Sequence, residues 1–207
     1  HGMSSVVYLL TKMSSNAIEK DRIAPLVKGA INYMNSYNKR QEEGFSLFPS
    51  WIDPNQSVVY NSRLAWCYGD IGIGKAFEWS GTVLQDESIK HRAVDILTAS
   101  SRRMSPENTL VVDAGFCHGS FGNAHMFHQF GLKSKQEDYE KAALFWLKDG
   151  LTRYSGYKEV PYKRWNAIAK AWELECNLLE GLSGIGLAII SLLSNEESTW
   201  DECLMLR

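Results

Sequence analysis

A pair of glycines three residues apart recurs along this chain and constrains its fold more than any other feature. The pattern occurs at Gly69–Gly72, Gly119–Gly122 and Gly181–Gly184, and each copy opens an apolar stretch with helical spacing. A degenerate copy, Gly2–Ser5, stands near the start of the chain. The intervals of about 50 to 67 residues leave room for two helices and a loop, which indicates stacked helical hairpins. Glycine at a helix start also permits a close approach of neighbouring backbone.

The remaining sequence is dominated by helical periodicity. Apolar residues at helical spacing predict helices over residues 6–13, 23–34, 94–104, 139–151 and 182–193. Strand-like stretches are short and fall at residues 57–60, 110–112 and 157–162. We therefore expect residues 1–207 to form a single all-α domain with minor β decoration. Because the chain begins with His1 inside a motif, we also expect further amino-terminal repeats to precede it.

Composition narrows the class of protein. An apolar share of 44% with 12% aromatic residues is enough for a packed core, and a net charge of −2 does not favour nucleic acid as a partner. No apolar run reaches the roughly 18 residues that a membrane span needs. Four cysteines and no visible signal peptide indicate a reducing, cytoplasmic location rather than a disulfide scaffold.

Two of the glycine pairs are preceded by a cysteine. Cys67 and Cys117 each lie two residues before the first glycine of a copy, and His118 follows Cys117. Two cysteines and one histidine are a sufficient ligand set for a catalytic zinc ion, whose fourth position stays open. The alternative is that both cysteines are small core residues, as free cysteines often are. Cys176 and Cys203 lack the glycine context, so we expect them to be buried core thiols.

Several blocks of the sequence resemble the lanthionine synthetase C-like (LanC) family. They are Trp66-Cys67-Tyr68-Gly69, Cys117-His118-Gly119, and the segment from Leu178 to Leu187. The opening His1-Gly2 and the closing segment from Trp200 to Leu206 are similar to the family's blocks at corresponding places. The resemblance implies an α/α toroid, a double ring of helical hairpins, of which this chain is an incomplete part without its amino-terminal repeats.

The resemblance also implies a chemistry and the residues that perform it. Members of the family hold zinc (Zn2+) with two cysteines and a histidine, which match Cys67, Cys117 and His118. They add a cysteine thiol to dehydroalanine or dehydrobutyrine, which closes a thioether ring in a peptide, as in lantibiotic biosynthesis. The matching catalytic residues are His1, as the proton donor, and Arg63, beside the developing enolate. A tag remnant at His1 and an ordinary surface arginine at Arg63 are the alternatives.

Partners follow from the same resemblance. It implies a dehydrated precursor peptide as substrate and a dehydratase or transporter as protein partner, in a complex associated with the membrane but without a membrane span. Two alternatives stay open: a LanC-like enzyme that adds glutathione or another thiol, and a non-catalytic zinc-containing toroid that binds a peptide or partner. One departure matters here, because no residue of this chain matches the family's active-site aspartate from an earlier repeat.

Overall fold

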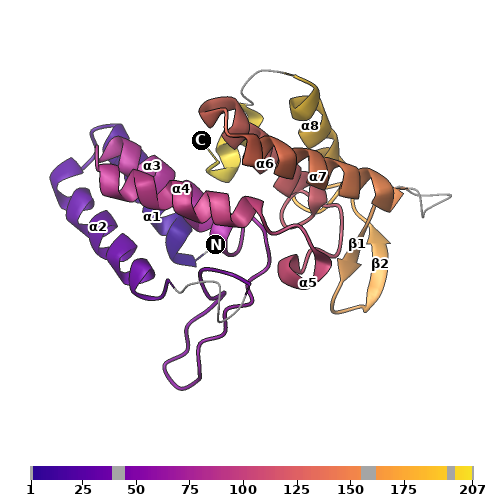
Figure 1. The fold of residues 1–207 in the computed structure, drawn as a ribbon, viewed down its shortest axis with the longest axis horizontal. Helices are drawn as coiled ribbons and strands as arrows, with labels where there is room; N and C mark the ends of the chain where they lie inside the picture. The colour runs from indigo at the N-terminus through magenta and orange to yellow at the C-terminus, as the bar shows by residue number, and fades with distance from the viewer. Residues whose placement is uncertain (1, 39–44, 155–161, 195–198, 207) are drawn as a thin grey trace. The chain divides into compact units, whose positions relative to one another are not determined.

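The computed structural model describes residues 2–38, 45–154, 162–194 and 199–206. Its elements are α1 (Gly2–Ser15), α2 (Lys20–Ser36), α3 (Asp70–Val83), α4 (Glu87–Ser101), α5 (Pro106–Thr109), α6 (Ser120–Ser134), α7 (Glu137–Tyr154), β1 (Lys163–Asn166), β2 (Ala171–Leu174), α8 (Leu182–Leu193) and the short helix η2 (Trp200–Leu204). Figure 1 labels α1 to α8 and both strands. Helices make up most of this described chain, and β1 and β2 form a two-stranded sheet. The prediction of a helical fold with minor β structure is confirmed.

The recurring glycines stand at the starts of helices, as their spacing predicts. Gly69, Gly119 and Gly181 are the residues immediately before α3, α6 and α8. Gly69 has φ +79°, a left-handed backbone conformation that other residues adopt only with strain. The second glycine of a pair serves a different purpose. A Cβ on Gly122 or Gly184 would overlap a backbone carbonyl of the loop that precedes the helix.

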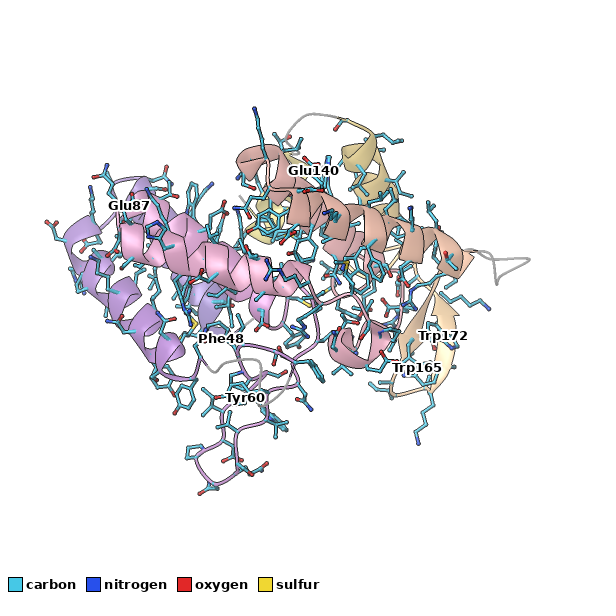
Figure 2. The ribbon with its side chains drawn as sticks, in the orientation of Figure 1. Phe48, Tyr60, Glu87, Glu140, Trp165 and Trp172 are labelled. Carbon is cyan, nitrogen blue, oxygen red and sulfur yellow. The ribbon has the colours of Figure 1, made fainter. Side chains whose placement is uncertain are left out.

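Contacts within the chain divide it into two compact units, and unit 1 comprises residues 1–62, 68–100 and 199–207. Here α1 packs against α2 and α3, and their apolar faces bury Ile31 and Phe77 almost completely. Phe48, labelled in Figure 2, contacts Phe77 edge-on. The ring centroids are 6.3 Å apart. The buried carboxylate of Asp70 accepts the backbone N–H groups of Leu47 and Phe48 at 2.9 and 3.0 Å. This carboxylate at the start of α3 therefore holds the preceding loop on the core.

Unit 2 comprises residues 63–67 and 101–198, and α6 is its central helix. α6 packs against both α7 and α8, which explains why nearly all of its residues are buried. Phe121 and Phe127 are fully buried on it. Beyond α7, β1 and β2 form an antiparallel hairpin in which Trp165 faces Trp172, with ring centroids 5.5 Å apart (Figure 2).

Two of the expected strands are not strands. Residues 57–60 and 110–112 are irregular, and no partner strand lies beside either of them in the described chain. Leu110 has φ +54° and ends α5, a backbone conformation that no strand continues through. Most of the third stretch, residues 157–162, lies outside the described residues. No helix of the described chain is long and apolar enough to cross a membrane. The expectation of a single domain stays a prediction.

Candidate metal centre

The structure brings together the three side chains that the cysteine motifs single out. Cys67 lies on the segment before α3, and Cys117 and His118 lie on the loop before α6. Their candidate ligand atoms, two Sγ and one imidazole nitrogen, are all within 4.8 Å of one another. Both cysteines are buried and neither is in a disulfide. Ligands at about 2.0–2.3 Å from one zinc ion would show separations of this size.

Backbone and side-chain hydrogen bonds hold the two ligand-bearing segments together. The indole Nε1 of Trp66 donates to the carbonyl of Phe116 at 2.9 Å, which joins the neighbours of the two cysteines. The amide Nδ2 of Asn123, on α6, donates to the carbonyl of Leu64 at 3.0 Å. Because each bond links one segment to the other inside unit 2, these bonds help to bring the two sulfur atoms together.

A third segment, the one before α8, is hydrogen-bonded to the Cys117 loop. The backbone N–H of Cys117 donates to the carbonyl of Leu179 at 2.6 Å. The neighbouring Glu180 is fixed by Arg164 from the hairpin, whose Nη1 lies 2.6 Å from its carboxylate. Each glycine-initiated helix of unit 2 thus has its preceding loop at this centre.

The interaction between Cys67 and Cys117 moves the pKa values of the two thiols in opposite directions. The hydrogen bond with Cys117, together with burial, raises the pKa of Cys67 far above its usual range. The same hydrogen bond and the nearby His118 lower the pKa of Cys117 to about 6, against the opposing effects of burial and Glu180. Hydrogen bonds with Asp113 and Cys117 raise the pKa of His118 to about 9. Two buried cysteine sulfur atoms and a histidine nitrogen form a donor set that suits zinc, and metal binding would release the protons that they carry.

Asp113 is a member of this centre that sequence reasoning missed. Its side chain is 5% exposed, and Oδ2 lies 3.5 Å from Nε2 of His118. Burial alone would raise the pKa of the Asp113 carboxyl, but His118, the Gly115 N–H and the charge of Arg63 outweigh burial and lower it. A signal for it exists in the sequence, because Asp113 and Arg63 each stand four residues before a cysteine of the cluster.

The two predicted catalytic residues, Arg63 and His1, differ in what the structure shows of them. Arg63 is half-buried and close enough to Asp113 for its charge to act on that carboxyl. His1 lies outside the described residues. His125 is not a predicted site residue; on α6 it is fully buried and packs on Phe116 with ring centroids 5.3 Å apart.

The expectation that the two remaining cysteines are core thiols is wrong. Cys176 and Cys203 are both exposed. Cys176 lies in the loop that follows β2, and Cys203 lies in the short helix η2. Both thiols are therefore surface groups of the described structure.

Comparison with known proteins agrees with the motifs. A family model described as "Lanthionine synthetase C-like protein" matches residues 1–205. The chain therefore belongs to the lanthionine synthetase C-like family, as its sequence blocks predict. No curated protein matches the chain.

Among solved structures, the chain is similar to nisin cyclase. The TM-score is 0.76 at 17% sequence identity, and the match covers 100% of this chain. At this identity the likeness shows the fold, so the expected α/α-toroid class is confirmed. The chain spans about half the length of that protein, 48% of the nisin cyclase chain.

Proposed function

We propose that this chain carries the zinc centre of a lanthionine cyclase, with a dehydrated precursor peptide as the substrate. The observation that carries the proposal is the buried cluster of Cys67, Cys117 and His118 in a member of the lanthionine synthetase C-like family. A zinc ion held by these three ligands would keep one position open for the peptide's cysteine thiol and lower the pKa of that thiol. A dehydratase or transporter as protein partner and a cytoplasmic location belong to the same proposal.

The proposed reaction is the addition of a thiol to an activated alkene. The cysteine thiolate of the peptide attacks Cβ of dehydroalanine or dehydrobutyrine, and a C–S bond forms. The π electron pair moves toward the neighbouring carbonyl, and the enolate that results takes up a proton at Cα. No oxidant or second substrate is required. The proton that the thiol loses balances the proton that Cα takes up.

Two residues of this chain would serve the later part of that reaction. Arg63 would stabilise the enolate charge, since it stands four residues before Cys67 and its charge acts within the centre. His1 would deliver the proton to Cα, because an imidazole titrates near neutral pH and suits general acid catalysis. Both assignments come from the motif resemblance.

Metal analysis of protein purified without chelator tests the centre. We expect about one zinc ion per chain in the wild type and loss of that zinc in Cys117→Ala. Cys176→Ala is the matched control, because it removes an exposed thiol and leaves the cluster intact. Equal zinc contents in wild type and Cys117→Ala would contradict the ligand assignment.

Mass-resolved measurement of thiol consumption on a dehydrated peptide tests the reaction. We expect the peptide's own cysteine to be consumed without a change in mass, because ring closure is an isomerisation. Glutathione supplied in excess distinguishes the cyclase from a thiol-adding enzyme, since an adduct would increase the peptide mass. A zinc-loaded protein that neither closes rings nor forms adducts would contradict the enzymatic proposal.

A further inference from the structure

The carboxylate of Asp113 lies beside Nε2 of His118, the imidazole nitrogen that is farther from the histidine backbone. Its Oδ2 lies 3.5 Å from Nε2 of His118, and both side chains are largely shielded from solvent. We propose that Asp113 is a positioning residue for the metal centre, whose carboxylate accepts the Nε2–H of His118 and thereby directs Nδ1 toward the metal. This inference rests on the proposed zinc site and adds a residue that lies outside the Cys117-His118-Gly119 block.

The carboxylate is fixed from several directions. Its Oδ1 accepts the backbone N–H of Gly115 at 3.1 Å. The Asp113 carbonyl accepts both the backbone N–H and the hydroxyl of Ser120, at 3.1 and 3.2 Å. The residue is thus tied to the Cys117 loop by its side chain and to the first turn of α6 by its backbone. A carboxylate held in this way can orient the imidazole without moving to meet it.

The glycine of the Cys-His-Gly block clears the space for this carboxylate. A Cβ on Gly119 would lie 2.5 Å from Oδ1 of Asp113 and would also overlap the backbone N of Gly115. Any side chain at this position would therefore displace either the Asp113 carboxylate or the loop that carries Cys117. The requirement for glycine at position 119 therefore follows from Asp113 as well as from the backbone of Gly115.

A carboxylate behind a ligating histidine has a known physical effect. It fixes the tautomer and the orientation of the ring and makes the ligating nitrogen more basic. Removal of such a partner typically weakens metal binding by about 10–100-fold. The charge of Arg63 also acts on Asp113, so the carboxylate joins the proposed catalytic cation and the metal ligand in one electrostatic unit.

Asp113→Asn tests the inference with little change in shape. The asparagine oxygen still accepts the Gly115 N–H, but its NH2 group then faces Nε2 of His118 and cannot accept a hydrogen bond. We expect zinc affinity, measured by competition with a chromophoric chelator, to fall by about 10–100-fold. The cobalt(II)-substituted protein should show altered ligand-field absorption, which a purely structural role of Asp113 would not produce.

Asp149→Asn is the matched control. Asp149 also binds the first turn of α6, through Ser120 and Arg153, but it does not face His118. We expect this variant to lose stability while its zinc affinity stays within about threefold of wild type, because the ligand set is untouched. If Asp149→Asn loses as much zinc affinity as Asp113→Asn, a general loosening of α6 explains both and the inference fails.

A measurement on the wild type keeps the inference testable if Asp113→Asn does not fold. Two-bond ¹H–¹⁵N correlations of ¹⁵N-histidine-labelled, zinc-loaded protein report which nitrogen of His118 carries the proton. A protonated Nε2 supports the inference, and a protonated Nδ1 overturns it. If the wild type binds no zinc, the proposed metal centre fails; if it binds zinc and Asp113→Asn binds zinc equally well, only the role of Asp113 fails.

Discussion

Replacement of Gly122 by alanine should disturb the metal centre through the backbone rather than through a ligand. Gly122 is buried in the first turn of α6, and a Cβ there would overlap the carbonyl oxygen of Phe116. Because the obstacle is a backbone atom, no change of rotamer relieves the overlap. The Phe116 carbonyl must move, and it is both the neighbour of Cys117 and the acceptor of the Trp66 indole N–H.

The size of the effect follows from the kind of overlap. Forcing an additional methyl group into a packed site costs about 1–3 kcal/mol in the free energy of unfolding. For a protein of this length, 1 kcal/mol shifts Tm by roughly 2–4 °C, so we expect Tm to fall by about 2–12 °C. Zinc affinity should fall with it, because displacement of Phe116 moves the Cys117 sulfur away from its partners.

Gly186→Ala is the matched control for this substitution. Gly186 lies within α8, and a Cβ there would meet nothing within 4 Å. Alanine in a helix interior is more favourable than glycine by roughly 0.5–1 kcal/mol, so this variant should be slightly more stable than wild type. Thermal unfolding followed by circular dichroism, with zinc content measured in parallel, compares the two. Equal stability and equal zinc in both variants would refute the steric argument.

Two further predictions concern catalysis and acid stability. His1→Asn should retain zinc and slow ring closure by about 10²–10⁴-fold, as mass spectrometry of a dehydrated peptide would show; a normal rate would exclude His1 as the proton donor. Hydrogen bonds from Ser88 and Lys28 lower the pKa of Asp86 to about 2, so the stability that Asp86 provides is complete above about pH 4 and is lost as the pH falls toward 2. Asp86→Asn removes the charge and should therefore be about 0.5 kcal/mol less stable than wild type in urea unfolding at pH 7, and most of the difference should be lost near pH 2; a constant difference would contradict this origin.

Features that depend on local sequence could be predicted, and features that depend on distant partners could not. The glycine pairs predict the starts of α3, α6 and α8 because the close approach that they permit involves the loop directly before each helix. Residues 57–60 and 110–112 have apolar character suited to strands, yet a strand also needs a partner, which a single stretch of sequence does not reveal.

The same distinction applies to the residues of the metal centre. The cysteines and His118 could be predicted because their motifs repeat beside the same glycine pattern. Asp113 has the same offset from Cys117 as Arg63 has from Cys67, but one is an anion and the other a cation, so this signal alone does not give Asp113 a role. Only the fold shows that the two charges act within one centre.

The separation of Cys67 and Cys117 along the chain has a consequence for folding. A metal bound to both sulfur atoms would close a loop of about fifty residues, much as a cross-link does. By the chain-entropy relation for disulfides, a closure of that length restricts the unfolded ensemble by about 4 kcal/mol. The loop contains α3, α4 and α5, so a bound metal would stabilise these helices against unfolding as well as the centre itself.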